Sequence, residues 1–397
     1  METSQVLQLL VALCFGAPAV LFGAYGLILV YYYRFRIPPY ERSNQTWTAN
    51  AVEPNVSIVL PTHNEELIIK KRIDNLLSLD YPRDKLEVVF VDDSTDSTSD
   101  VIRDYAKRYP QMRLVRFDER MGYSPCLIAG CRTASGEVVV LAEASSFMNE
   151  DVIRRLASDL RNPSISMVTG NDVLLNRDDK AGRSEALYLK ILNFVRTGES
   201  NMDSTIFMKG EAAAVKKNLI GDLQALEGCP GTADTGIALL VRKRGGRVIY
   251  DPRVQFCEYA PSSHGERIRQ KVTRGANLIK VIWHFREMLF RRKFGNFGLV
   301  TLPITFAMLT FAPVSLLAGF LFLALLTLGS PGTYYIVWLI FASFLLLLLV
   351  FSRSLLYTIL ESEYSLLKAL YEILVVRKTH DRIEKIVSTR SAGSSNN

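Results

Sequence analysis

The stretch Leu86-Glu87-Val88-Val89-Phe90-Val91-Asp92-Asp93-Ser94 decides the fold of this 397-residue chain. Its apolar residues have the length and composition of a buried strand, and the strand ends in two carboxylates and a serine that can cap a helix. In an open α/β sheet, ligands bind outside the carboxyl ends of the strands. Asp92 and Asp93 therefore predict a functional site at that edge of a sheet.

Strand and helix patterns alternate on both sides of this stretch. Strands are expected at 56–60, 86–91, 113–117, 137–141 and 165–169, and helices at 65–79, 97–109, 125–133 and 149–161. Further along, helices are expected at 184–196 and 235–244, and extended segments at 204–209 and 247–250. This alternation predicts an α/β domain with a mainly parallel sheet.

Long apolar segments lie at both ends of the chain. Residues 6–33 carry no charge and exceed the roughly 20 residues that a helix needs to cross a bilayer. Residues 297–328 and 334–351 are also uncharged, and the short turn 329–333 between them suggests a hairpin. About three transmembrane helices are therefore expected. The alternative, core helices of a soluble protein, is disfavoured because none of these segments has a polar face.

Basic residues set the expected orientation. Arg34 and Arg36 follow the first apolar segment, Arg291 and Arg292 precede the second, and Arg353 follows the third. The positive-inside tendency puts these residues and the middle domain in the cytoplasm. The sequence thus predicts a multi-pass protein of the cell membrane.

Five segments are expected along the chain. They are a transmembrane anchor at 1–36, a cytoplasmic α/β domain at 54–275, an interfacial helix at 276–296, a transmembrane hairpin at 297–352, and an amphipathic helix with a basic tail at 353–397. Apolar and basic residues mix in 278–294, which suits a helix in the membrane interface. A helix packed only on the α/β domain is the alternative there.

Carboxylates follow three of the expected strands. The first strand leads into 61–66, the second into Asp92 and Asp93, and the fourth into Glu143-Ala144-Ser145. Such clustered negative charge implies a bound cation or a ligand that donates hydrogen bonds. For 61–66, helix capping by Asn64 is an equally good explanation. The five cysteines and four histidines show no spacing typical of a metal site.

Two motifs reveal a family resemblance. Val56-Ser57-Ile58-Val59-Leu60-Pro61-Thr62-His63-Asn64-Glu65-Glu66 and Val91-Asp92-Asp93-Ser94-Thr95-Asp96-Ser97-Thr98 resemble the opening of the family-2 glycosyltransferases, which have an A-type nucleotide-sugar-binding fold. The resemblance runs from about 54 to 274. Membrane-anchored members include cellulose-synthase-like and hyaluronan-synthase-like enzymes and polyprenyl-phosphate glycosyltransferases.

The resemblance implies which residues bind the donor. For the nucleotide these are Thr62, Asn64, Glu65, Asp92 and Asp93. Arg120 opens Arg120-Met121-Gly122-Tyr123, a loop in which the family often has Gly-Lys and this chain has Tyr123 instead of the lysine. Gln270 opens a segment similar to the Gln-any-any-Arg-Trp motif, whose last two positions hold Thr273 and Arg274. The resemblance assigns Arg120 and Gln270 to the donor as well.

The resemblance also implies a mechanism. Gly231-Thr232-Ala233-Asp234-Thr235 resembles the Thr-Glu-Asp motif, so Asp234 would be the general base, with helix capping as its alternative role. The Asp-any-Asp metal motif is replaced by Glu143-Ala144-Ser145, so Glu143 and Ser145 would hold a divalent cation, Mg or Mn, less strongly. Arg274 would support the leaving diphosphate, and Arg269 and Lys271 could join it on a diphosphate or a lipid phosphate.

The sequence therefore predicts a membrane-bound inverting glycosyltransferase. Its expected partners are a nucleotide sugar, with a UDP-sugar favoured, a lipid-linked or glycan acceptor, and the membrane, and no nucleic acid. One alternative is a catalytically reduced member that acts as a binding or scaffold subunit, because several motif positions depart from the family. Another is a nucleotidyltransferase, which would need a glycine-rich basic loop where this chain has 61–66.

Overall fold

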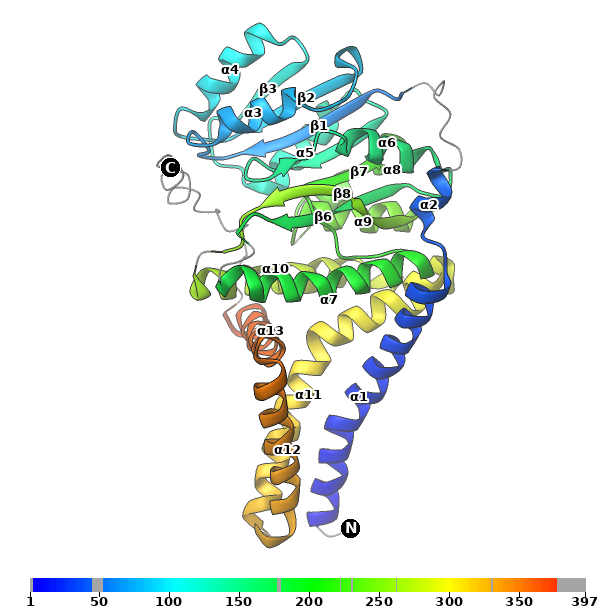
Figure 1. Ribbon diagram of the computed structural model, residues 1–397, viewed down its shortest axis with the longest axis vertical. Coiled ribbons are helices and arrows are strands. Elements are labelled where there is room, and N and C mark those ends of the chain that lie inside the picture. The colour runs from blue at the N-terminus through cyan, green and yellow to red at the C-terminus, as the bar shows by residue number, and fades with distance from the viewer. Residues whose placement is uncertain are drawn as a thin grey trace.

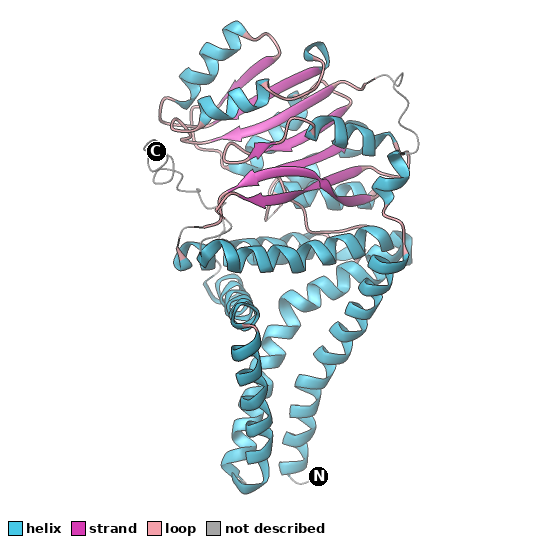
Figure 2. Ribbon diagram, viewed as in Figure 1, coloured by secondary structure: helices cyan, strands magenta, loops and turns pink. Residues whose placement is uncertain are grey.

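A computed structural model describes residues 3–44, 53–176, 180–221, 223–229, 231–261, 263–329 and 331–376. An α/β domain lies at one end, and long helices extend away from it (Figure 1). Two helices, α7 (Lys180–Met202) and α10 (His264–His284), run between the sheet and these long helices. Figure 2 shows the strands confined to the α/β domain.

The sheet has eight strands in the order β3-β2-β1-β4-β7-β6-β8-β5. Their bounds are β1 Val56–Thr62, β2 Leu86–Asp92, β3 Met112–Arg116, β4 Val138–Ala142, β5 Phe147–Met148, β6 Met167–Leu174, β7 Ala212–Lys216 and β8 Val248–Glu258. The β2–β3, β1–β2, β1–β4 and β6–β8 pairs are parallel, whereas β7 is antiparallel to both β4 and β6, and β5 is antiparallel to β8. The sheet is thus mixed and mostly parallel, as the first half of the sequence predicts.

Alternating side chains of the central strands build a core on each face of the sheet. Ile58 and Leu60 pack with α3 (Ile69–Leu77), α4 (Thr98–Arg108) and α6 (Val152–Arg161). Val59 packs on the other face with α5 (Tyr123–Thr133) and α9 (Ala233–Lys243). Both faces of the sheet are therefore covered, and its strand ends are the place left for a ligand.

Two predicted segments of the second half differ from the structure. Residues 204–209 are extended but form no strand, and the strand in this region is β7. Within 204–209, the backbone N–H of Thr205 donates to the carbonyl of Val248, and the backbone N–H of Lys209 donates to Thr169 Oγ1. The predicted boundary between 275 and 276 falls inside α10, which continues without a break to His284.

Two segments, Ser4–Glu41 and Phe297–Gly329, are long and apolar enough to cross a bilayer. The first overlaps nearly all of α1 (Thr3–Phe35) and the start of α2 (Pro39–Asn44), and the second ends with α11 (Leu302–Gly329). The hydroxyl of Ser315 on α11 donates to the carbonyl of Cys14 on α1 at 2.9 Å. A third helix, α12 (Pro331–Phe351), runs back along α11 as a hairpin (Figure 1), and its crossing of the membrane stays a prediction.

The helix α13 (Arg353–Tyr371) follows the hairpin and packs against α10. Its Glu361 is buried and accepts from Arg267 Nε at 2.7 Å and from Lys271 Nζ at 2.6 Å, both on α10. The predicted amphipathic helix is thus held by ion pairs beneath the α/β domain. The predicted basic tail at 377–397 lies outside the described residues.

Candidate active site

Hydrogen bonds to the Asp92 side chain connect the carboxyl ends of β1 and β2. This carboxylate is fully buried and accepts four hydrogen bonds from the protein. The donors are Thr62 Oγ1 at 2.7 Å, Ser94 Oγ at 2.5 Å, Arg116 Nη1 at 3.2 Å, and the hydroxyl of Ser99. Because both carboxylate oxygens are occupied, Asp92 and Thr62 support the rim from within. Their predicted contact with a nucleotide stays a prediction.

The turn after β1 is fixed by the loop after β2. Asn64 has a positive φ of 52°, a conformation that asparagine tolerates better than most residues. Its backbone N–H donates to Ser94 Oγ at 2.8 Å, and its Oδ1 accepts from the N–H of Thr95 at 2.9 Å. Capping by Asn64 is therefore wrong, since α3 begins only at Ile69. Asn64 is exposed and Glu65 half-buried, so both lie at the rim.

Asp93 holds the loop that leads into α5. Its Oδ2 accepts from the backbone N–H groups of Met121 at 2.8 Å and Gly122 at 2.9 Å, and its Oδ1 lies 2.8 Å from His63 Nδ1. Burial would raise the pKa of Asp93, but these hydrogen bonds lower it. Gly122 has a φ of 86°, which favours glycine. Asp93 thus fixes the loop that begins at the exposed Arg120.

This loop carries Tyr123 to Asp234. A Cβ atom on Gly210 would lie 2.8 Å from the Tyr123 hydroxyl and 2.9 Å from Asp234 Oδ2, so the two side chains converge on that glycine. Next to Tyr123, Ser124 Oγ donates to the carbonyl of Gly231 and accepts from the backbone N–H of Ala233. Asp93 and Asp234, far apart in sequence, therefore belong to one site.

Asp234 lies in the first turn of α9 and is 7% exposed. The residue before the helix is Thr232, and the Asp234 side chain accepts hydrogen bonds from the N–H of Thr235, at 2.8 Å, and from the hydroxyl of Thr232. Burial raises the pKa of Asp234, and the nearby carboxylate of Glu211 raises it further. A carboxylate of raised pKa is a better proton acceptor at neutral pH, which suits a general base.

Glu143 reaches the same rim through the β4–β7 pairing. Ala142 on β4 pairs with Ala212 on β7. Glu143 directly follows Ala142, and Glu211 directly precedes Ala212. Because β4 and β7 are antiparallel, both glutamates lie at the same end of these two paired strands. Ser145 is half-buried two residues further along. The rim thus holds Asp93, Glu143 and Asp234, the three acids that the sequence predicts.

The predicted site residues on α10 have different surroundings. Arg274 is exposed to solvent. The surrounding protein would lower the pKa of Arg274, but the carboxylates of Glu258, Glu211 and Glu185 raise it. Gln270 lies one helical turn earlier, half-buried. Lys271 is paired with Glu361, whereas Arg274 interacts electrostatically with Glu211 and Glu258 near the acidic rim.

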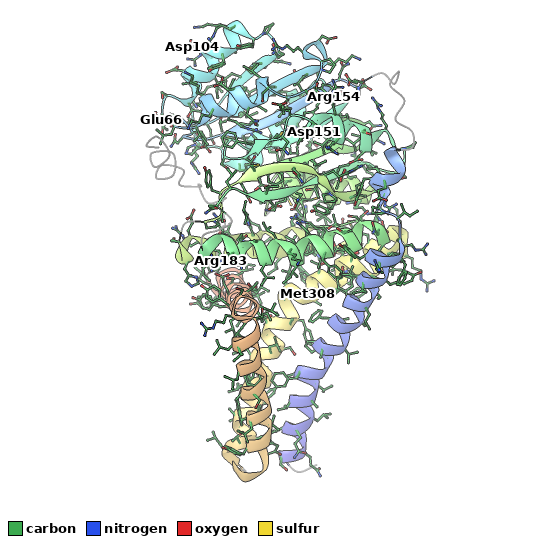
Figure 3. The ribbon with its side chains drawn as sticks, viewed as in Figure 1. Glu66, Asp104, Asp151, Arg154, Arg183 and Met308 are labelled. Carbon is green, nitrogen blue, oxygen red and sulfur yellow. The ribbon has the colours of Figure 1, made fainter. Side chains whose placement is uncertain are left out.

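Sequence reasoning missed several residues of this region. Glu185 and Tyr188 on α7 lie near Arg274, and Asp172 on β6 pairs with Lys209 and, at 3.4 Å, with Arg196. None of them stands in a recognisable motif, because only the packing of α7 against the sheet brings them to the site. A side view of the side chains labels Glu66 after β1 and Arg183 near the start of α7 on one side of the molecule (Figure 3).

A comparison with protein families decides the identity of this domain. The sequence profile of glycosyltransferase-like family 2 matches residues 54–277. The chain belongs to glycosyltransferase family 2. This membership agrees with the resemblance of its two opening motifs to the same family.

The chain is similar to several known proteins. It is 23% identical to the poly-beta-1,6-N-acetyl-D-glucosamine synthase of Staphylococcus epidermidis over 61% of this chain and 59% of that protein, and 23% identical to the probable glycosyltransferase YdaM of Bacillus subtilis over 64% and 62%. The chain thus spans about three fifths of the length of these curated relatives. A mannosyltransferase from Pyrobaculum calidifontis, solved with GDP-Man and Mn²⁺, shares 27% identity and a TM-score of 0.69 over 93% of this chain and 100% of its own.

The metal-binding residues of this glycosyltransferase are few. Among the described residues, no group of three or more His, Cys, Asp and Glu side chains is arranged to hold a metal ion. Glu143 offers one carboxylate and Ser145 one hydroxyl, and hard divalent cations take six or more oxygen ligands. The site therefore fits a cation only where diphosphate oxygens of the donor complete the coordination.

Proposed function

We propose that this glycosyltransferase is an inverting enzyme of the cell membrane that transfers a hexose from a nucleotide sugar to an acceptor at the cytoplasmic face. One observation carries the proposal. The loop held by Asp93 brings Tyr123 to Asp234 beside Gly210, and Glu143 and Glu211 lie at the same end of the β4–β7 pair. This arrangement supports a proposal in which the nucleotide-sugar site, the place for the diphosphate and the general base share one rim.

In the proposed reaction, the carboxylate of Asp234 takes the proton of an acceptor hydroxyl. The acceptor oxygen forms a bond to the anomeric carbon as the bond from that carbon to the phosphate oxygen breaks, so the nucleoside diphosphate leaves and the configuration inverts. Glu143 and Ser145 would hold a divalent cation, which neutralises charge on the leaving diphosphate when bound. Arg274 would add a second positive charge that supports the leaving diphosphate.

Two donors deserve a direct comparison. The sequence favours a UDP-sugar, and the curated relatives include N-acetylglucosaminyltransferases such as that of Rhizobium meliloti, 25% identical over 55% of this chain and 54% of that protein. The mannosyltransferase from Pyrobaculum calidifontis, which matches nearly the whole chain, was solved with GDP-Man. GDP-mannose is therefore the competing donor.

Membrane attachment is proposed from α1 and α11. The two apolar segments meet the length requirement for a span, and α1 also reaches the α/β domain. The Tyr25 hydroxyl donates to Glu199 Oε1 on α7 at 2.6 Å, and Asn201 Nδ2 donates to the carbonyl of Tyr32 at 3.1 Å. These contacts would hold the catalytic domain close to the membrane surface.

A donor screen with the full chain in lipid nanodiscs tests this function. Radiolabelled UDP-GlcNAc, UDP-glucose and GDP-mannose are offered with Mn²⁺ and a lipid extract. Transfer from one donor is expected, and Asp234→Asn should lower kcat by about 10²-fold or more while the donor Kd stays within twofold. Asp104→Asn is a matched control, since Asp104 is exposed and pairs only with its neighbours on α4. Binding without transfer from any donor would instead support the scaffold alternative.

A further inference from the structure

A group of charged residues continues from Asp234 toward α7 and α10. We call it the α7/α10 cluster: Glu185 and Tyr188 on α7, Glu211 just before β7, Glu258 at the end of β8, and Arg274 on α10. These residues come from four separate elements, and the reaction steps above use only Arg274. Their position next to the base raises the question of what they bind.

The cluster is continuous with the proposed base. Gly210, which lies against Asp234 Oδ2, has Lys209 and Glu211 as its neighbours in the chain. Lys209 Nζ lies 3.6 Å from Glu258 Oε1, and Glu258 and Glu211 both act electrostatically on Arg274. A ligand that reaches Asp234 from this side must pass these groups.

Glu185 carries the strongest indication of a ligand. Its side chain is 95% buried, yet within the described parts of the chain its Oε2 accepts no hydrogen bond. A buried acceptor without a donor costs free energy, and proteins rarely leave one in place. The carboxylate acts electrostatically on Arg274 and Tyr188 and raises the pKa of both. Because Arg274 is exposed, a ligand can approach Glu185 from the solvent.

The charges of this region favour hydroxyl groups over phosphate. Four carboxylates, Glu185, Glu211, Asp234 and Glu258, stand against two cations, Lys209 and Arg274. Lys209 is already paired with Asp172, and the charge of Asp172 is balanced by Arg196 at 3.4 Å. An incoming phosphate would meet net negative charge, whereas a sugar hydroxyl can donate to each of the carboxylates.

Lys271 is one of the three basic residues, with Arg269 and Arg274, predicted to hold a diphosphate or a lipid phosphate. Lys271 donates to Glu361 at 2.6 Å, and its Nζ lies 4.7 Å from the centre of the Tyr188 ring. Lys271 is thus held by α13 and by an aromatic face. Tyr188 brings a half-buried aromatic ring to a site whose motif lacks the family's tryptophan, and aromatic rings are suitable surfaces for sugars.

We propose that the α7/α10 cluster is the acceptor subsite and that it takes a neutral sugar, with Glu185 Oε2 accepting from one of its hydroxyl groups. The acceptor is then the sugar end of a glycan or glycolipid, and not a polyprenyl monophosphate. This inference rests on the proposed function, because it gives the acceptor of the same reaction. In this subsite Glu185 is the residue that binds a hydroxyl group of the acceptor.

The test compares two acceptor classes with the full chain in nanodiscs. The probes are octyl β-glycosides of glucose, mannose and N-acetylglucosamine, and a polyprenyl monophosphate, each with the donor found in the screen. At least one glycoside is expected to accelerate donor turnover, and the polyprenyl monophosphate to give none. Glu185→Gln should raise the KM for that glycoside about tenfold, the effect of one lost charge-assisted hydrogen bond. The donor Kd should change less than twofold, which also shows that the variant is folded.

Glu363→Gln is the matched control, because Glu363 on α13 also has a buried Oε2 without a partner among the described residues but lies outside the cluster. It should leave the KM for the glycoside unchanged. Tyr188→Leu is a second variant, expected to raise the same KM. An unchanged KM in Glu185→Gln overturns the inference, as does transfer to the polyprenyl monophosphate alone. Donor turnover that no glycoside accelerates overturns it while leaving the proposed function intact, whereas a wild-type protein that binds no donor refutes the proposed function first.

Discussion

Replacing Arg72 with methionine should stabilise the protein. Arg72 is on α3, fully buried, and its Nε and Nη2 have no hydrogen-bond partner among the described residues. Within the described segments its side chain donates one hydrogen bond, from Nη1 to Asn75 Oδ1 at 2.6 Å. Burial lowers the pKa of Arg72 to about 9, and no carboxylate opposes this effect. The guanidinium is therefore charged at neutral pH in a place that disfavours its charge.

The size of the effect follows from that pKa. The pKa of Arg72 falls from 12.5 to about 9, and at about 1.4 kcal/mol per pKa unit its charge costs on the order of 5 kcal/mol. Arg72→Met removes this cost and fills the site with an apolar side chain, but it loses a hydrogen bond of about 1 kcal/mol and leaves Asn75 Oδ1 with one donor, the backbone N–H of Met148. Because the smaller methionine also leaves part of the space of the guanidinium empty, a net gain of about 2 kcal/mol is expected. That gain raises the melting temperature by about 4 to 8 °C for a domain of this size.

Thermal unfolding of the full chain in nanodiscs, followed by tryptophan fluorescence, measures this difference. Arg132→Met is the control, since Arg132 is half-exposed and pairs with Glu227 at the surface. Such a pair contributes at most about 1 kcal/mol, so the control should be neutral or slightly destabilised. A lower melting temperature for Arg72→Met than for the control would refute the reasoning, because it would mean that the buried guanidinium makes favourable interactions.

Three further predictions concern the site and its supports. Gly210→Ala should lower transfer at least 10²-fold without unfolding the protein, because the new Cβ would lie 2.9 Å from Asp234 Oδ2; an activity assay with donor binding as the folding control tests this. Burial raises the pKa of Glu199 to about 7, so the folded state binds a proton that the unfolded state releases, and stability should fall between about pH 5 and 7; Glu199→Gln should flatten that dependence in thermal unfolding, and an equally steep curve would contradict it. Glu361→Ala leaves two cations on α10 without their carboxylate and should destabilise the protein by about 3 kcal/mol, measured in the same way.

The first half of the fold could be predicted from the sequence because its strands are apolar and regular. Val56–Thr62 and Leu86–Asp92 carry β-branched and aromatic residues that alternate between two cores. The strand β7 was missed for the opposite reason, since Ala212, Ala213 and Ala214 have low strand propensity. Their small side chains suit a strand buried between β4 and β6, but only the neighbouring strands reveal this.

The site could be predicted in part. The positions of Asp93, Glu143 and Asp234 at one rim follow from strand ends and from family motifs. The difference between Asp92 and Asp93 could not be predicted, because it depends on which face of the strand each side chain takes. Asp92 turns into the hydroxyl groups of Thr62, Ser94 and Ser99, whereas Asp93 turns to a loop almost 30 residues away. Glu185 could not be found at all, because its role depends on the packing of α7.

The most direct test of the central claim is a structure of the full chain with the donor nucleotide sugar and Mn²⁺. The account predicts the diphosphate beside Glu143, the nucleoside against the loop held by Asp93, and the Asp234 carboxylate facing the anomeric carbon across the acceptor position. A nucleotide bound away from the carboxyl ends of β1, β2 and β4, or an Asp234 carboxylate turned away from the sugar, would contradict it.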